Sequence, residues 1–369
     1  MPRHKPIRVI IAGGGTGGHV FPAIAIANAL KEKVLNAQIL FVGAKGRMEM
    51  SKVPAAGYHI IGLNIAGLQR RLTFKNFLVP FKLFDSIIRS KNIIKRWKPD
   101  LVIGVGGYAS GPIVRAAAKK GIPTLIQEQN SYPGITNKIL AKRAEKICVA
   151  YEGMERFFPK EKIFLTGNPV RKEILSVNDK KQEAYEFFEL SPKKNVLMVF
   201  GGSLGARSIN ESIKDNLKLF LYNDVQIIWQ TGKLYYNDAV EYVKGLEKYA
   251  VRVYEFIDRM DLAYSIADIV VSRSGAIAVS EICLVQKPAV FVPSPYVAED
   301  HQTKNAMALV NHNAAIMIRD SEVKEKIGPV VMDLFDHEDK RFKLIERMTG
   351  LAYRDAAKNI AEVALSLVK

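Results

Sequence analysis

Three glycine-rich segments, each directly after a short apolar run, constrain the fold of this chain more than any other feature of its sequence. We call them the first, second and third glycine loops; they span residues 13–18, 104–112 and 201–207. The runs before them are apolar, contain β-branched residues and stop abruptly at glycine, which is typical of strands buried on both faces. Such strands occur in parallel sheets that alternate with helices, so we expect an α/β fold.

The alternation of strand and helix occurs twice along the chain, on either side of a polar interval at residues 178–194. The expected strands are residues 7–12, 38–43, 100–104, 123–127, 146–150, 196–200, 226–230, 251–256, 269–272 and 289–293. Because 369 residues exceed the size at which one hydrophobic core stops growing, we expect two Rossmann-like domains that face each other across a cleft. We expect their join near residues 168–171, and Pro22 in the first turn of the first helix.

The charge of the chain indicates a polyanionic partner. Lys and Arg number 54 against 37 Asp and Glu, a net charge of +17, and the sequence pI is near 9.6. Nine of the basic residues and one acid, Asp85, lie in residues 69–98, which gives this segment 9 − 1 = +8. Nucleic acid, an anionic membrane surface or a phosphorylated substrate would each match such an excess.

Aromatic residues in the same segment favour a membrane surface over nucleic acid. Apolar residues recur there at helical spacing between lysines and arginines, as in helices that lie in a membrane interface. They are Phe74, Phe77, Leu78, Phe81, Phe84 and Ile88. We expect Phe74 and Phe77 to point outward and Ile88, Ile93 and Ile94 to pack inward. Because no nucleic-acid-reading motif accompanies the charge, we expect no nucleic-acid partner.

The sequence shows no sign of a membrane-spanning or secreted protein, which indicates the cellular compartment that we expect. No apolar stretch approaches the roughly 20 residues that a membrane-spanning helix needs, and the start of the chain does not resemble a secretory signal. Cys148 and Cys283, the two cysteines, are flanked by apolar residues and are expected to be buried thiols in a reducing compartment. We therefore expect a cytoplasmic protein that does not cross the membrane.

The first glycine loop has the spacing of a dinucleotide fingerprint, with Gly13, Gly15 and Gly18 at the required positions. An NAD site also needs an acid at the end of the second strand, and residues 43–47 contain none. Lys45 and Arg47 could instead accept a 2′-phosphate, so an NADP-dependent oxidoreductase is the alternative. That alternative leaves the third glycine loop unexplained.

Several separated motifs resemble those of a bacterial family, the UDP-N-acetylglucosamine:N-acetylmuramyl-pentapeptide pyrophosphoryl-undecaprenol N-acetylglucosaminyltransferases (the MurG family). The motifs are residues 14–19, 108–112, 128–130, 167–171, 201–206, 272–281 and 301–302. The resemblance implies a glycosyltransferase of the B type (GT-B). It would transfer N-acetylglucosamine, with inversion, from UDP-N-acetylglucosamine to undecaprenyl-pyrophosphoryl-N-acetylmuramyl-pentapeptide (lipid I), giving lipid II and UDP in peptidoglycan biosynthesis. The enzyme would be peripheral, on the cytoplasmic side of the inner membrane.

The resemblance also implies which part of the chain serves which substrate. Residues 1–170 together with a C-terminal helix at 350–369 would form the acceptor- and membrane-facing domain, and residues 171–349 would bind UDP-N-acetylglucosamine. The C-terminal helix would return to the first domain, which accounts for its broad apolar face.

Position by position, the resemblance implies three groups of site residues. Donor-binding residues would be Thr16, Gly17, Gly18, Asn130, Arg171, Ser203, Ile257, Ala276, Ile277, Ala278, Val279, Ser280, Glu281 and Gln302. Of these, Ile257 would lie at the uracil, Glu281 at the ribose and Gln302 at the sugar. Acceptor-binding residues would be Gly15, Tyr108, Ser110 and Gly111.

The reaction needs a base for the acceptor hydroxyl. His19 is the first candidate, since an imidazole titrates near neutral pH, and a structural role for it is nearly as plausible. Glu128 is the second candidate. The chain contains no Asp-x-Asp pair and no Cys/His cluster, so we expect no metal and no cofactor. Backbone N–H groups and Arg171 would then meet the charge of the diphosphate.

Overall fold

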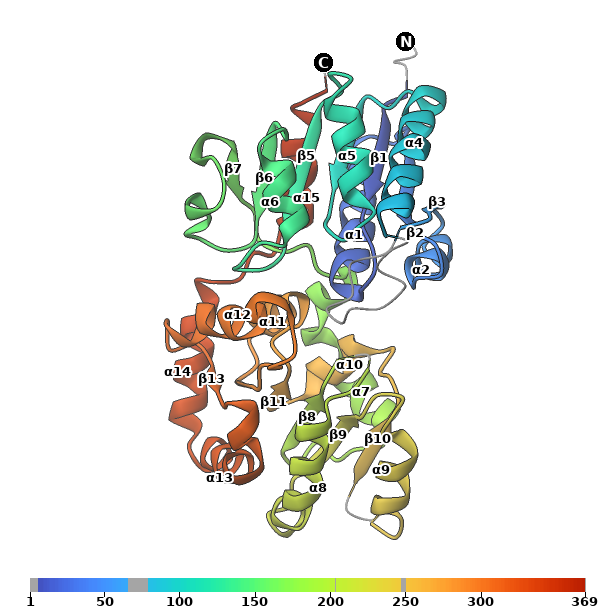
Figure 1. Cartoon of the computed structure of the whole chain (residues 1–369). Helices are drawn as coiled ribbons and strands as arrows, with labels where there is room; N and C mark the ends of the chain where they lie inside the picture. Colours follow the sequence, from blue (N-terminus) through green and yellow to red (C-terminus); the bar gives the residue numbers. More distant parts are fainter. Residues whose placement is uncertain (1–5, 66–78, 203, 247–249, 369) are drawn as a thin grey trace. The chain divides into compact units, whose positions relative to one another are not determined.

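The computed structural model describes residues 6–65, 79–202, 204–246 and 250–368. It divides into two compact units (Figure 1). Unit 1 comprises Met1–Arg171 and Asp355–Lys369, and unit 2 comprises Lys172–Arg354. Each unit is a parallel sheet covered by helices on both faces, as the alternating sequence pattern predicts.

Unit 1 is built on a seven-stranded sheet with the order β3-β2-β1-β4-β5-β6-β7. Its strands are β1 (Arg8–Ala12), β2 (Gln38–Ala44), β3 (His59–Leu63), β4 (Leu101–Gly104), β5 (Thr124–Glu128), β6 (Lys146–Val149) and β7 (Ile163–Leu165). Its helices are α1 (Gly17–Lys33), α2 (Glu49–Ala55), α4 (Val79–Trp97), α5 (Ser110–Ala118), α6 (Ile135–Ala141) and α15 (Ala356–Leu365). The order reverses between β1 and β4, and the first and second glycine loops follow those two strands.

Two helical layers cover the sheet of unit 1. Side chains alternate along β1, so that Val9 and Ile11 pack with α1 and α15, whereas Ile10 and Ala12 pack with α4, α5 and α6. The C-terminal helix α15 lies against α1, with Ile360 completely buried. The apolar face of the last segment is therefore part of the core of unit 1 (Figure 1).

Unit 2 repeats the architecture with a six-stranded sheet of order β10-β9-β8-β11-β12-β13. Its strands are β8 (Val196–Phe200), β9 (Gln226–Gln230), β10 (Val251–Tyr254), β11 (Ile269–Ser272), β12 (Ala289–Phe291) and β13 (Ile316–Met317). Its helices are α7 (Lys181–Phe188), α8 (Arg207–Tyr222), α9 (Tyr236–Val243), α10 (Met260–Ile266), α11 (Ala276–Val285), α12 (His301–Val310), α13 (Val323–Asp336) and α14 (Glu338–Thr349). The switch point lies between β8 and β11, beside the third glycine loop.

All ten expected strands are present, but the expected start of the first helix is wrong. Helix α1 begins at Gly17, so Pro22 lies inside it and not in its first turn. The glycine loop is therefore shorter than the position of the proline suggests. As a result, His19 belongs to the first turn of α1.

The expected orientation of α4 is correct for Ile94, which is buried, and wrong for Ile88, which is 43% exposed. The buried side of α4 includes Ser86, Ser90 and Ile94, at a spacing of four residues. Small serines let α4 approach its neighbour α5 closely, and Ile88 consequently lies on the opposite side. Phe74 and Phe77 lie outside the described residues.

Candidate active site

The first glycine loop places His19 at the amino end of α1. Thr16 is the N-cap residue of this helix, and its hydroxyl lies 3.3 Å from Nδ1 of His19. The other side of the imidazole faces the second glycine loop, where a Cβ on Gly106 would stand 2.6 Å from Cδ2 of His19. Glycine at position 106 therefore makes room for the ring, and the two loops together fix its position.

The second glycine loop lies against the first. A side chain on Gly107 would overlap the carbonyl of Gly14, and Gly107 has a φ of +79°. Ser110 is fully buried and donates a hydrogen bond of 2.8 Å to the carbonyl of Gly107, so its hydroxyl stabilises the loop. Tyr108 is 54% exposed, and Gly111 follows Ser110 in the first turn of α5.

Glu128, the second candidate base, is buried at the carboxyl end of β5. Its Oε1 accepts hydrogen bonds from the backbone N–H and the side-chain amide of Asn130, at 3.0 and 3.2 Å. Its Oε2 accepts from the Gly134 N–H at 3.1 Å and the Asn137 amide at 2.9 Å. Burial raises the pKa of Glu128, and these four donors act in the opposite direction. The carboxylate therefore organises the loop that carries Asn130.

Arg171 ends unit 1 near the amino end of α1. Its guanidinium lies 5.7 Å from the ring centroid of Phe21, a cation–π distance. The Phe21 ring in turn lies close to Gly17, where an added Cβ would be 3.2 Å from the ring edge. Arg171, Gly17 and Gly18 are thus assembled within the same unit as His19.

Sequence reasoning missed Glu49, a buried carboxylate beneath the first glycine loop. Its side chain accepts one hydrogen bond from the Gly15 N–H and another from the Ala44 N–H, both at 2.9 Å. The residue is 1% exposed. The dinucleotide fingerprint places its acid at the end of the second strand, whereas Glu49 is the first residue of α2 and folds back to that strand end.

In unit 2 the third glycine loop is tied to Ile257 through Gln230, which sequence reasoning also missed. Gln230 is the last residue of β9 and is buried. Its amide donates to the carbonyl of Gly202 at 3.1 Å and accepts from the backbone N–H of Ile257 at 2.9 Å. One side chain therefore fixes two parts of the expected donor site. Ser203 lies outside the described residues.

Helix α11 contributes the expected donor-binding turn. Gly275 is its N-cap residue, Ala276 and Val279 are buried, and Ile277, Ala278 and Ser280 are partly buried in its first turns. Glu281 is 2% exposed and lies 3.4 Å from the hydroxyl of Tyr264. The helix presents backbone N–H groups at its amino end, which suit an anion.

The segment after β12 is held against α12 through Gln302. Oε1 of Gln302 accepts from the Ser294 N–H at 2.8 Å, and its carbonyl accepts from the Ser274 hydroxyl at 2.9 Å. Gln302 thus connects the turn before α11 with the turn after β12.

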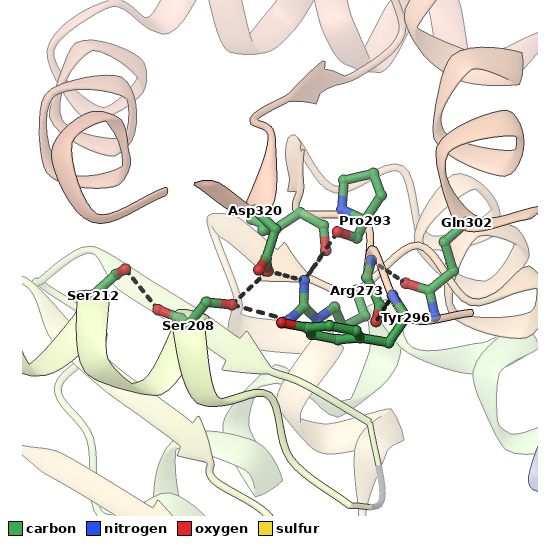
Figure 2. Close-up of polar contacts among 9 residues, drawn as sticks. Ser208, Ser212, Arg273, Pro293, Tyr296, Gln302 and Asp320 are labelled. Carbon is green, nitrogen blue, oxygen red and sulfur yellow. Dashed lines mark hydrogen bonds and ion pairs between the residues drawn. The ribbon is translucent and has the colours of Figure 1, made fainter. Parts of the chain in front are cut away.

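Arg273 lies at the centre of a second polar network in unit 2 (Figure 2). Its guanidinium donates to the carbonyls of Val292 and Pro293, at 2.9 and 3.1 Å, and to the carboxylate of Asp320. It also reaches the hydroxyl of Ser208, at 3.0 Å. With four protein acceptors, this guanidinium joins the carboxyl ends of several strands to the start of α8.

A cavity of about 610 Å³ opens beside this network. It is lined by the third glycine loop together with Arg207, Tyr235, Arg273, Tyr296 and Gln302. Ile257 and Glu281 do not line it. The cavity therefore shares the third glycine loop and Gln302 with the expected donor site, but not the two residues expected at the uridine.

The described part of the chain contains neither a metal-binding cluster nor a helix able to span a membrane. Among these residues, no group of three or more His, Cys, Asp or Glu is arranged to hold a metal ion. No helix within the described ranges has both the length and the apolar composition needed to cross a membrane.

The two units match the two halves of a known class of enzyme. Residues 9–149 match the glycosyltransferase family 28 N-terminal domain, and residues 196–360 match the corresponding C-terminal domain. The fold and these matches define a two-domain glycosyltransferase of the GT-B type.

Individual relatives identify the family within this class of glycosyltransferases. A Parabacteroides distasonis protein, UDP-N-acetylglucosamine–N-acetylmuramyl-(pentapeptide) pyrophosphoryl-undecaprenol N-acetylglucosamine transferase, is 53% identical over 99% of both chains. A Flavobacterium psychrophilum protein of the same name is 52% identical over 98% of both. The crystal structure of Acinetobacter baumannii MurG superposes with a TM-score of 0.77 at 29% identity, covering 98% of this chain and 100% of that one. The chain belongs to this MurG family. The oxidoreductase alternative finds no support among these relatives.

Proposed function

We propose that this protein transfers N-acetylglucosamine from UDP-N-acetylglucosamine to lipid I, releasing UDP and forming lipid II for peptidoglycan synthesis. The observation that carries the proposal is the identity of 52–53% to transferases of that name along almost the whole chain. The geometry of the glycine loops adds a chemical rationale, because each loop follows a strand of a parallel sheet, where ligands of such folds bind.

We assign the donor to unit 2. The uracil would lie at the backbone of Ile257, whose position Gln230 fixes. The carboxylate of Glu281 suits the ribose hydroxyls, since it can accept hydrogen bonds from both. The N–H groups at the amino end of α11 would face the diphosphate, and Gln302 the sugar.

We assign the base to His19. The imidazole is held beside the amino end of α1 by Thr16 and by the space at Gly106. It would take the proton from the acceptor hydroxyl as that oxygen attacks the anomeric carbon and UDP departs, which inverts the configuration. The acceptor-binding assignments of Gly15, Tyr108, Ser110 and Gly111 rest on their place in the two loops around His19. Glu128 acts indirectly in this scheme, through the loop of Asn130.

No resident metal is needed in this scheme. Arg171 and the helix amino ends would neutralise charge on the departing diphosphate. A chelator such as EDTA should leave the rate of sugar transfer unchanged. Loss of activity in EDTA would refute this part of the proposal.

We assign α4 to the membrane surface, which would make the enzyme peripheral on the cytoplasmic face of the inner membrane. Phe81 and Phe84 are 75% and 66% exposed, and Ile88 on the same helix is 43% exposed. The same helix carries five basic residues: Lys82, Arg89, Lys91, Lys95 and Arg96. Each basic residue near anionic lipid contributes about 1 kcal/mol, so several together can hold the protein reversibly.

A transfer assay tests the reaction. The purified protein should move radiolabelled N-acetylglucosamine from its UDP derivative to a lipid-linked muramyl-pentapeptide diphosphate, and NADPH should neither be consumed nor bind. Absence of lipid-linked label at full UDP-sugar saturation would refute the proposal.

A vesicle sedimentation assay tests whether α4 binds the membrane surface. The Phe81→Ser/Phe84→Ser variant should lose most of its binding to vesicles containing anionic lipid. Phe342→Ser is a matched control, because Phe342 is also 66% exposed but belongs to α14 of unit 2. Equal binding by the double variant and the wild type would refute the assignment.

A further inference from the structure

Glu49 is a buried carboxylate that the proposed mechanism leaves unused. Its two oxygens join neighbouring strands at their carboxyl ends: Oε1 bonds the Ala44 N–H at the end of β2, and Oε2 bonds the Gly15 N–H after β1. Both distances are 2.9 Å, and the residue is 1% exposed. Carboxylate bonds to backbone N–H groups are charge-assisted and stronger than neutral ones.

Two glycines form the space that this side chain occupies. A Cβ on Gly43 would stand 2.6 Å from Cγ of Glu49, and a Cβ on Gly14 would overlap the carboxylate itself. The first glycine loop is therefore shaped around an internal side chain. This explains why Gly14 is small even though it is not one of the fingerprint glycines.

The same contact changes what the loop can bind. In a dinucleotide site, glycine-loop N–H groups are offered to a phosphate. Here the Gly15 N–H is already donated to a carboxylate, and a negative charge close by would repel a second anion.

The hydrogen bond between Glu49 and the Gly15 N–H lies only a few bonds from His19. Gly15 precedes Thr16, whose carbonyl accepts the backbone N–H groups of His19 and Val20 at 3.1 and 3.2 Å. The Thr16 hydroxyl also lies 3.3 Å from the imidazole. A shift of Gly15 would therefore move the N-cap and the imidazole together.

We propose that Glu49 is a positioning residue: it holds the first glycine loop so that the loop presents His19 to the acceptor, and it keeps the Gly15 N–H from binding a phosphate. The proposal rests on the proposed function for its readout, the rate of sugar transfer. It assigns the diphosphate of the donor to groups other than the Gly15 N–H.

Two variants test this role of Glu49, with one control. Glu49→Gln keeps the shape but replaces one accepting oxygen with an N–H₂ group, which cannot accept. Glu49→Asp keeps the charge but is one methylene too short to span both N–H groups. The control is Asp100→Asn, because Asp100 also accepts a backbone N–H, that of Arg8 at 2.8 Å, but at the opposite end of the same sheet.

Both Glu49 variants should lower kcat about 10- to 100-fold, the loss expected when a reacting group is displaced by about 1 Å. The KM for UDP-N-acetylglucosamine and the stoichiometry of UDP binding should stay within about twofold of the wild type, because the proposed uridine site lies in unit 2. Because UDP binding reports only unit 2, folding of unit 1 is checked separately by the fluorescence of Trp97 in α4, in a Trp229→Phe background. Glu49→Asp serves if Glu49→Gln fails to fold. Asp100→Asn should keep the wild-type kcat.

Three results would overturn the inference. The first is a kcat for Glu49→Gln within about twofold of the wild type. The second is an equal loss in Asp100→Asn, which would mean general loosening of unit 1. The third is tighter UDP binding by Glu49→Gln, which would place the diphosphate at the first loop. Inactivity of the wild type would instead refute the proposed function.

Discussion

Replacing Arg273 with methionine should destabilise unit 2 more than any surface substitution. The side chain of Arg273 is 12% exposed and that of Asp320 is 18% exposed. Removal of one partner leaves the other charge partly buried without its counter-ion, which costs about 3–5 kcal/mol at fully buried sites. The carbonyls of Val292 and Pro293 also lose a donor, at about 1 kcal/mol each. Because neither charge is fully buried, we expect a total near 3–5 kcal/mol.

Urea unfolding measures this loss. Trp229 is completely buried in unit 2, so its fluorescence in a Trp97→Phe background reports that unit alone. The double variant Arg273→Met/Asp320→Leu should recover about 2 kcal/mol of the loss, since no uncompensated charge remains. Arg207→Ala is the control, because Arg207 pairs with Glu211 on the exposed surface of α8 and should change nothing measurable. Wild-type stability in Arg273→Met, or no recovery in the double variant, would refute this reasoning.

Two further predictions concern stability. Ile360→Ala should destabilise unit 1 by about 2–5 kcal/mol, because Ile360 of α15 is fully buried on α1; a Trp97 fluorescence melt within about 0.5 kcal/mol of the wild type would contradict that packing. Burial lowers the pKa of Lys287 to about 8, so the unfolded chain holds more protons between pH 8 and about 10.4, and the free energy of unfolding rises with pH in that window. Lys287→Met should remove this rise, of about 3 kcal/mol; identical pH slopes in urea titrations would count against it.

The interior strands of both sheets could be predicted from the sequence, as could the edge strand β10, but the other three edge strands could not. Interior strands such as β1 and β8 are apolar along their whole length because both faces are covered. The strands that were missed, β3, β7 and β13, are all edge strands with partly exposed residues. An edge strand needs little apolar surface, so a search for buried runs passes over it.

The residues of the candidate site also divide into those that the sequence indicates and those that it does not. His19, Glu128 and Glu281 could be proposed for the site because they belong to motifs contiguous in sequence, and their roles stay predictions. Glu49 and Gln230 could not, because their role is to join backbone groups from segments distant in the chain. The orientation predicted for Ile88 was wrong because the buried face of α4 carries serines. Close packing between helices favours small residues as well as apolar ones.

We propose that unit 2 holds UDP at the carboxyl edge of its sheet. A crystal structure determined after soaking with UDP tests it most directly. We expect the uracil at the Ile257 backbone, the ribose within hydrogen-bonding distance of Glu281 and the diphosphate at the amino end of α11. An empty site there at saturating UDP, or the nucleotide bound on the first glycine loop of unit 1, would contradict it.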